Sequence, residues 1–403
     1  MIPPPPVALL ASELGGGRGH VSTLAQAGLA LGPGVTVIAA LGEMRHAAEL
    51  ERLGFATLSC PKLSASAAVK AQPLTRGNAT WACYLADCGF MDRAVLQRSL
   101  RFWRDLLLQR KVAILIADYA PLAQRAALAL REEGHAIRIV TIGTGYGIPP
   151  SDLAPLPQLT PDYNRVIHSE ASVLESLNAA AAELGMSALP RLSALYAADL
   201  ALIGTFDVLD PYQRAKAQLS PPVVSRSDIL AQGDEVYAYF SREEVEGTAL
   251  VKALCALSLP KRGYFPAASE AAKARLAASG MVIEEKPISF NMIAQRSRVM
   301  LHPAPHGSIC TAALAGLPQI GLPGHREQLC HARRAEAAGI CKVLPPAAAP
   351  EAIIAAIEGV YHDPKALPRA HALARDLRQD FPEHPMAALS HRLAPLVREV
   401  LVG

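Results

Sequence analysis

The chain has 403 residues, a formal net charge of +3, and a composition that is 51% hydrophobic and 19% charged. This length is too great for one ordinary core, so two domains are expected, and the apolar content excludes a disordered chain. The charges are spread without a run of lysine or arginine, and aromatic residues make up only 5%. We therefore predict no nucleic-acid partner.

No apolar stretch reaches the roughly 18 residues that span a bilayer. The N-terminal segment lacks a basic region and its prolines precede a strand-length apolar run, which favours a first strand over a signal peptide. We predict a cytoplasmic protein without a transmembrane segment and leave peripheral membrane contact open. The 7 cysteines form no CxxC pair, which favours reduced thiols. Cys83 and Cys88 could form a disulfide, but no pattern favours it.

The first half of the chain alternates strand-like and helix-like segments. Short apolar runs that end in turns are typical of buried parallel strands, and segments with helical spacing of apolar residues follow them. The expected strands lie at 7–12, 35–40, 56–61, 112–118, 137–143 and within 198–210. The expected helices begin at His20 and cover 44–54, 96–107, 122–134 and 165–185. Residues 62–92 indicate an irregular, partly helical insertion, and 143–159 a long loop.

The second half repeats this alternation after a proline-broken linker at 219–235. Its expected strands start near residues 236, 261, 281, 297, 318 and 341, and a helix follows each of the last three. The repeated strand–helix–strand order predicts an α/β protein with two Rossmann-like doubly wound domains facing across a cleft. We assign residues 1–222 to the first domain and 235–370 to the second. The C-terminal helices of 371–403 are expected to cross back to the first domain.

A glycine-serine turn between a strand and a helix is the first candidate binding motif, in "PHGSICTAAL". Gly307 lets the backbone approach a ligand closely, and Ser308 can cap the helix that starts there. The N-terminus of that helix offers N–H groups and a partial positive charge, which suit a diphosphate. An ordinary capped strand–helix turn is the alternative.

A second polar motif lies at the start of the next helix, where Glu327 and Gln328 stand side by side. A carboxylate and an amide can together accept hydrogen bonds from and donate them to sugar hydroxyls. A solvated helix start is the alternative. The histidines of this region match no known ligand spacing, so we predict no metal site.

Together these motifs resemble the donor-binding signature of GT-B nucleotide-sugar glycosyltransferases, the class that includes UDP-glucuronosyltransferases and macrolide glycosyltransferases. That signature has a His-Gly-Gly-x-Gly-Ser/Thr turn, a Glu-Ala-Leu helix and a Gly-Val-Pro strand entry, and it ends in Pro, an acidic-Gln pair, Asn and Arg. The residues that match are Gly307, Ser308, Gly316 to Pro318, Pro323, Glu327, Gln328 and Arg334.

The chain also departs from this signature. Pro303, Ala304 and Pro305 occupy the His-Gly-Gly positions. Thr311 stands at the Glu position that holds ribose hydroxyls, and His331 at the Asn position. His302 or His306 is then the candidate replacement for the phosphate-binding histidine. The donor contacts that the resemblance implies come from His302, His306, Gly307, Ser308, Thr311, Glu327 and Gln328.

The N-terminal turn "GGGRGHV" resembles the same class, in which a glycine-rich turn after the first strand presents a histidine to the acceptor. His20 matches that catalytic position, and Gly17 of the turn is expected at the donor. An imidazole there can remove the acceptor's proton as the hydroxyl attacks the anomeric carbon. Asp118 matches the acidic partner that orients the ring, and both would lie at the carboxyl edge of one sheet.

Aromatic residues of the first half offer two interpretations. Trp81, Phe90 and Tyr146 could line an apolar acceptor pocket or belong to the core. Trp103 is expected in the core, because it belongs to an apolar helix stripe.

The sequence thus predicts an inverting, metal-independent hexosyltransferase that uses an NDP-sugar, with UDP favoured, and a hydroxyl acceptor. No cofactor is expected, because helix amides can meet the charge of the leaving diphosphate. Two alternatives stay open: a nucleotide-sugar epimerase or hydrolase on the same fold, and a catalytically silent GT-B protein that assists a true transferase. The sequence defines neither the acceptor nor the sugar.

Overall fold

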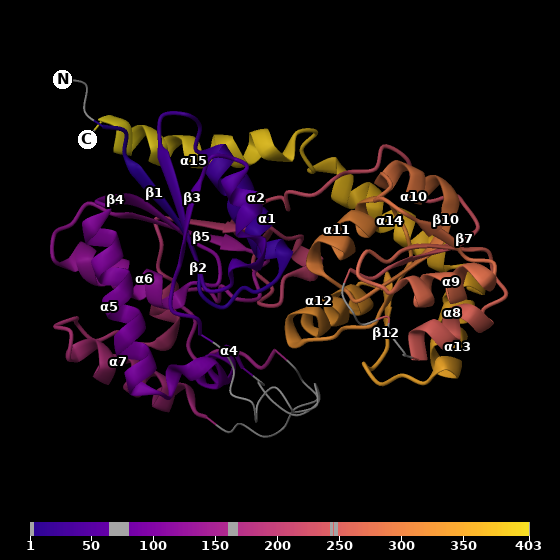
Figure 1. Ribbon diagram of the computed structural model, residues 1–403, viewed down its shortest axis with the longest axis horizontal. Coiled ribbons are helices and arrows are strands. Elements are labelled where there is room, and N and C mark those ends of the chain that lie inside the picture. The colour runs from indigo at the N-terminus through magenta and orange to yellow at the C-terminus, as the bar shows by residue number, and fades with distance from the viewer. Residues whose placement is uncertain (1–3, 64–79, 160–167, 242–244, 246–248, 403) are drawn as a thin grey trace. The chain divides into compact units, whose positions relative to one another are not determined.

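The computed structural model describes residues 4–63, 80–159, 168–241, 245 and 249–402, and it divides into two compact units (Figure 1). The N-terminal unit comprises Met1–Thr205, Arg214–Val223 and His384–Gly403. The C-terminal unit comprises Phe206–Gln213 and Val224–Glu383. The last two helices therefore belong to different units, α14 (Ala366–Gln379) to the C-terminal and α15 (Pro385–Val402) to the N-terminal unit.

The N-terminal unit is built on a six-stranded parallel sheet with the order β3-β2-β1-β4-β5-β6. Its strands are β1 (Val7–Ser12), β2 (Thr36–Leu41), β3 (Ala56–Ser59), β4 (Val112–Ala117), β5 (Arg138–Gly143) and β6 (Leu200–Ile203). The direction of winding reverses between β1 and β4, so the loops that follow these two strands diverge. In such sheets the ligand site lies at this switch point.

Helices cover both faces of this sheet, as the strand–helix alternation predicts. They are α1 (Arg18–Ala30), α2 (Ala47–Glu51), α4 (Trp81–Leu85), α5 (Arg93–Gln109), α6 (Pro121–Glu132) and α7 (Glu170–Ala182), together with α15. One face packs against α1, α2 and α15, with Leu10 and Ile116 in the shared core. On the other, α5 lies beside α6 and α7 (Figure 1).

Helix α15 is part of the N-terminal core rather than an appended tail. It packs against α1, and Leu393 is fully buried there. We expect Leu393→Ala to lower the free energy of unfolding of this unit by about 2–5 kcal/mol, since it removes a buried side chain and leaves a cavity. Urea unfolding measures this change. Leu401→Ala on the same helix, where the side chain is 50% exposed, is the control and should have little effect. Equal losses from both substitutions would contradict this role of α15.

The C-terminal unit repeats the architecture with a second six-stranded parallel sheet, of order β12-β11-β10-β7-β8-β9. Its strands are β7 (Glu235–Tyr239), β8 (Lys261–Tyr264), β9 (Val282–Glu284), β10 (Ser297–His302), β11 (Gln319–Gly321) and β12 (Cys341–Val343). The winding reverses between β7 and β10, which places the switch point at the turn after β10.

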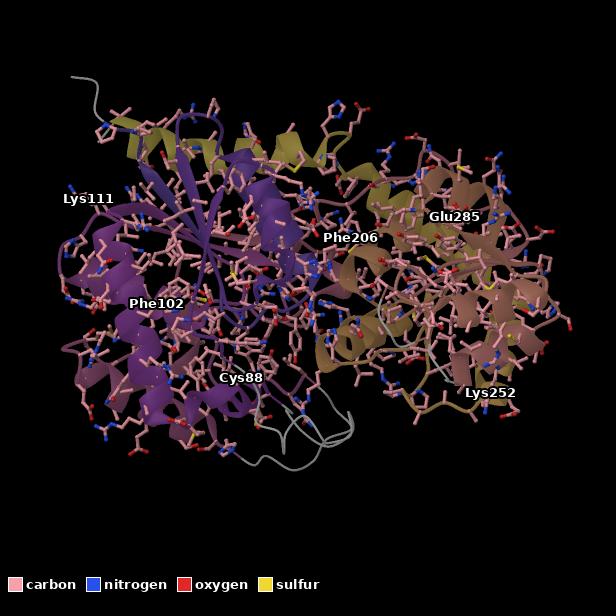
Figure 2. The ribbon with its side chains drawn as sticks, in the orientation of Figure 1. Cys88, Phe102, Lys111, Phe206, Lys252 and Glu285 are labelled. Atoms are coloured by element: carbon pink, nitrogen blue, oxygen red, sulfur yellow. The ribbon has the colours of Figure 1, made fainter. Side chains whose placement is uncertain are left out.

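The helices of this unit also lie on both faces of its sheet. They are α8 (Ala249–Ala256), α9 (Glu270–Ala278), α10 (Phe290–Arg296), α11 (His306–Leu314), α12 (Arg326–Ala337), α13 (Pro350–His362) and α14. One core joins α8, α9 and α13 to the sheet. The other face carries α10 and α11, and α11 in turn packs on α12 and α14. Side chains fill the layers between sheet and helices in each unit (Figure 2).

The two doubly wound sheets confirm the predicted fold class, with small differences at element ends. Helix α1 begins two residues before His20, and the segment 44–54 forms a 3₁₀ turn followed by the short α2. The strand within 198–210 ends at Ile203, and a 3₁₀ turn follows at Asp207–Leu209. Much of the predicted insertion at 62–92 lies outside the described residues, but its end is helical in α4 and in Ala86–Phe90.

The cysteines and the helices bear on two further predictions. All 7 cysteines are free in the structure, Cys83 and Cys88 included, and their reduced state stays a prediction. Among the helices of the described residues, none is long and apolar enough to cross a membrane. The cytoplasmic location stays a prediction.

Candidate active site

The structure brings His20 and Asp118 together in the N-terminal unit. His20 lies in the first turn of α1, after β1, and Asp118 directly follows β4, so the two residues flank the switch point of the sheet. The Nδ1 atom of His20 is 2.9 Å from Oδ2 of Asp118. The Asp118 side chain is 2% exposed and that of His20 is 19% exposed. A buried carboxylate therefore orients a ring that solvent can reach, the arrangement of a general base and its partner.

Glycines make the space that this pair occupies. A Cβ atom at Gly15 would lie 2.5 Å from Cγ of His20 and 2.6 Å from Oγ of Ser12, closer than real contacts allow. Gly143 has a φ of +154°, and its Cβ atom would lie 3.2 Å from Oδ1 of Asp118. The glycine-rich turn after β1 is thus required for the position of the imidazole itself.

Tyr119 packs against the imidazole of His20. Its ring meets that of His20 edge-on, with the ring centroids 4.7 Å apart. Its backbone has a φ of +52°, which is uncommon for a residue other than glycine. A Cβ atom at Gly147 would come within 2.6 Å of the Tyr119 ring. Strained backbone of this kind is typical of functional sites, and here it aims an aromatic ring at the candidate base.

An aromatic cluster extends from Tyr119. Trp81 lies edge-on to Tyr119 and to Tyr146 and stacks on Tyr84, with centroid distances of 5.7, 5.4 and 4.6 Å. Its indole N–H donates to the hydroxyl of Tyr196, and burial raises the pKa of that phenol. Trp81 is fully buried, whereas Tyr84 is partly exposed. The cluster is therefore mainly a packed wall beside His20, with Tyr84 as its accessible edge.

The two remaining aromatic residues belong to the core. Phe90 and Trp103 are fully buried, which confirms the core assignment of Trp103. Its indole N–H donates to the carboxylate of Glu13. Glu13 is a polar residue of this region that the sequence interpretation missed. The available signal was an acidic residue placed directly after the apolar run of β1.

The turn after β10 in the C-terminal unit leads into the candidate diphosphate site. Helix α11 begins at His306 and its N-cap is Pro305, which offers no side-chain cap. The prediction that Ser308 caps the helix is therefore wrong, because the helix starts two residues earlier and Ser308 lies in its first turn. Gly307 is exposed, and a Cβ atom there would meet only Cγ1 of Val224, at 4.0 Å. The first-turn amides of a helix have no partner within it and suit a phosphate.

The structure contradicts the assignment of His302 to the phosphate. This side chain is fully buried, its Nδ1 accepts from the amide of Ala304 at 2.9 Å, and its Nε2 lies 3.0 Å from Oε1 of Gln319. Burial lowers the pKa of His302 to about 4, so the ring is neutral. His302 instead stabilises the turn that follows β10. In this turn Ala304 has a φ of +57°, at a position where the GT-B signature has glycine.

His306 lies nearer the candidate site. It is partly exposed, and its ring centroid is 4.6 Å from that of His331. Partial desolvation of the ring and the neighbouring His331 lower the pKa of His306 well below its usual value. Thr311 is buried and its hydroxyl donates to the carbonyl of Gly307 at 2.7 Å, so that proton is not available to a ribose hydroxyl.

Glu327 and Gln328 lie in the first turn of α12, as the sequence indicates. Glu327 is partly exposed, and its Oε1 is 3.8 Å from Nε2 of the buried His331. Gln328 is buried, and its Oε1 accepts from the amide of Gly324 at 2.8 Å. One acceptor position of Gln328 is therefore occupied within the protein, whereas the Glu327 carboxylate is partly exposed.

Gly17 is the last residue of the predicted set. Gly17 is the N-cap of α1, and its carbonyl accepts from the amide of His20 at 3.2 Å, so it supports the start of that helix. Within the described ranges, no group of three or more His, Cys, Asp or Glu side chains could hold a metal ion.

Comparison with solved structures defines the fold class. The calicheamicin glycosyltransferase CalG4 is 15% identical, covers 98% of each chain and gives a TM-score of 0.66. The glycotransferase of kitacinnamycin is 16% identical, covers 99% of this chain and 100% of its own, and gives 0.65. The spinosyn rhamnosyltransferase SpnG complexed with thymidine diphosphate is 17% identical, covers 98% and 100%, and gives 0.63.

These similarities show that the chain has the fold of the GT-B glycosyltransferases, as the resemblance implied. At such low identity they define the fold and no more. No family model matches the chain, and no curated protein matches its sequence significantly.

Proposed function

We propose that this protein is an inverting glycosyltransferase that moves a hexose from a nucleoside diphosphate sugar to a hydroxyl acceptor. The observation that carries the proposal is the contact of 2.9 Å between His20 and Asp118 at the switch point of a GT-B sheet. With Nδ1 directed at Asp118, the nitrogen that takes up the acceptor proton is Nε2. The carboxylate stabilises the imidazolium that forms.

In the proposed reaction the acceptor O–H bond breaks and its proton passes to His20. The oxygen forms a bond to the anomeric carbon as the bond from that carbon to the diphosphate breaks. The diphosphate leaves with the electron pair, and the first-turn amides of α11 meet its charge. Attack opposite the leaving group inverts the configuration. No metal ion is required in this scheme.

The donor contacts are assigned to the C-terminal unit. We assign the diphosphate to Gly307 and Ser308, with His306 beside them, and the sugar hydroxyls to Glu327 and Gln328. The sequence favours a UDP-sugar, whereas similar structures were solved with thymidine diphosphate. The apolar edge at Tyr84 supports an acceptor with an aromatic or other apolar body.

Calorimetry with UDP-, TDP- and GDP-hexoses, each with and without EDTA, tests this assignment. We expect one class of donor to bind at a single site, with an affinity that EDTA leaves unchanged. Failure of all three donors to bind would overturn the proposed donor site, and loss of binding with EDTA would overturn metal independence.

Gly307→Ala is expected to weaken donor binding without unfolding the protein. The added methyl group fits the surrounding structure, since only Val224 lies within 4.0 Å, but it occupies the surface that the phosphate must approach. Loss of one charge-assisted hydrogen bond predicts a Kd about 10- to 100-fold higher. Gly359→Ala, another helical glycine of this unit with open space around it, is the matched control. Unchanged affinity in Gly307→Ala would exclude this helix end as the diphosphate site.

A further inference from the structure

Glu13 is a buried carboxyl group with an unusual number of structural partners. It follows β1 directly and is 1% exposed. Its Oε1 accepts from the indole N–H of Trp103 on α5, and its Oε2 accepts from the amide of Leu122 at 2.8 Å. Helix α5 is the one that Phe102 marks in Figure 2. Each carboxylate oxygen thus has its own donor, and the two donors come from different helices.

The backbone at Glu13 also contacts the segment between β4 and α6. The amides of Glu13 and Leu14 both donate to the carbonyl of Tyr119, at 3.1 Å each. Helix α6 begins at Pro121, and its N-cap, Ala120, makes no side-chain cap. The Glu13 carboxyl group therefore takes the place of the missing side-chain cap, through its hydrogen bond from the Leu122 amide.

The segment held in this way is the one that carries the Asp118 carboxylate and the Tyr119 ring. Tyr119, with its positive φ of +52°, stands at the first of the two points where Glu13 makes contact. A left-handed backbone conformation is unfavourable for a residue with a side chain, and it persists where the surroundings hold it. Hydrogen bonds at the Tyr119 carbonyl and at the Leu122 amide supply that restraint.

We propose that Glu13 is a positioning residue, which fixes the segment from Asp118 to Leu122 so that the Asp118 carboxylate meets His20. The inference rests on the proposed roles of His20 and Asp118. In this proposal Glu13 touches neither the donor nor the acceptor, and it acts through the contact between His20 and Asp118.

The chemistry of the carboxyl group explains why glutamine should fail at this position. Both oxygens of a carboxyl group can accept a hydrogen bond, and they keep acceptor capacity when the group is protonated, whereas glutamine has one acceptor atom and one donor group. In Glu13→Gln the amide NH₂ would face either the Trp103 indole N–H or the Leu122 amide, and in both orientations two donors would oppose each other. The segment should then relax, and Asp118 should lose its alignment with His20.

NMR of histidine-labelled protein tests the proposal without requiring activity. The Nδ1–H proton of His20, assigned with His20→Ala, reports its hydrogen bond to Asp118. We expect this signal to shift or disappear in Glu13→Gln, and to shift less in Trp103→Phe, which removes only one donor. Glu133→Gln is the matched control, because Glu133 also joins α5 to α6, through Arg104 at 2.6 and 2.7 Å, but at the far end of α6.

Turnover gives the second readout. We expect Glu13→Gln to lower kcat by at least about 10-fold with little change in the donor KM, and Glu133→Gln to leave both unchanged. An unchanged His20 signal in folded Glu13→Gln would overturn the proposal, as would equal effects of Glu13→Gln and Glu133→Gln. If the NMR result holds but the wild type transfers no sugar, the proposed function fails while the positioning role stands.

The pH dependence of stability tests the burial of the Glu13 carboxyl group. Burial raises the pKa of Glu13 from 4.5 to about 8, against the opposing N–H groups of Leu122, Trp103 and Ala123. The ionisable groups that face it, Cys60 and Tyr196, have pKa values that burial raises, so both stay neutral below pH 9. The wild type should therefore lose stability relative to Glu13→Gln as the pH rises from about 4.5 to 8, because ionising a buried carboxyl opposes folding. Parallel stability curves for the two proteins would contradict the burial of an ionising Glu13.

Discussion

Replacing His20 by alanine is expected to lower kcat by about 10²- to 10⁴-fold while the donor still binds. The imidazole lies 2.9 Å from Asp118, and alanine leaves the acceptor hydroxyl without this proton acceptor. Donor contacts are assigned to the other unit, so the affinity for the nucleotide should not change. Steady-state turnover and calorimetry on the same protein measure the two effects.

Asp118→Asn extends this prediction to the partner residue. The amide no longer supplies a charge to stabilise the imidazolium, and it can favour the wrong tautomer of His20, so kcat should fall in the same direction. His135→Ala, an exposed histidine of the same unit, is the control for loss of an imidazole as such. A His20→Ala enzyme with wild-type turnover would exclude His20 as the base.

Gly15→Ala should remove most of the activity by displacing the His20 ring. The new Cβ atom would stand 2.5 Å from Cγ of the imidazole and 2.6 Å from Oγ of Ser12. Because Ser12 is buried at the end of β1, we expect the partly exposed imidazole to move. The ring must therefore leave the hydrogen bond to Asp118. Since misplacement of a catalytic group by about 1 Å can cost 10²-fold, we expect kcat to fall by about that factor.

The neighbouring glycines provide matched controls for this substitution. A Cβ atom at Gly16 or at Gly19 has no atom within 4 Å, although both residues belong to the same turn and helix start. Gly16→Ala and Gly19→Ala should keep at least half of the wild-type kcat. If all three alanine variants lost activity together, flexibility of the turn would explain the result better than crowding of His20.

Much of the fold could be predicted from the sequence because buried parallel strands leave a strong local signal. "VALLAS" and "VAILIA" are apolar runs that end at turns, and both form strands at the predicted positions. The pairing of His20 with Asp118 was implied by the resemblance to the GT-B class, and in the structure the two residues follow adjacent strands of one parallel sheet. Two such sheets with the same winding order then account for the fold class.

Local patterns failed where contacts distant in sequence decide a side chain's role. His302 stands beside a glycine-serine turn and suggests a phosphate ligand, but Gln319, 17 residues later, receives its Nε2 proton inside the core. Ser308 is of a residue type that is common at helix N-caps, yet the helix begins at His306. The role of Glu13 could not be predicted, because its partners Trp103 and Leu122 lie 90 and 109 residues away in the sequence.

The most direct test of the proposed glycosyl transfer is release of nucleoside diphosphate from UDP-, TDP- and GDP-hexoses, measured for the wild type and His20→Ala. The assays should include a panel of hydroxylated aromatic and macrocyclic acceptors. The proposed function predicts that the wild type releases diphosphate from at least one donor, faster with a suitable acceptor, and that His20→Ala is slower by 10²-fold or more. Equal release by the two proteins, or no release from any donor by folded wild type, would contradict it.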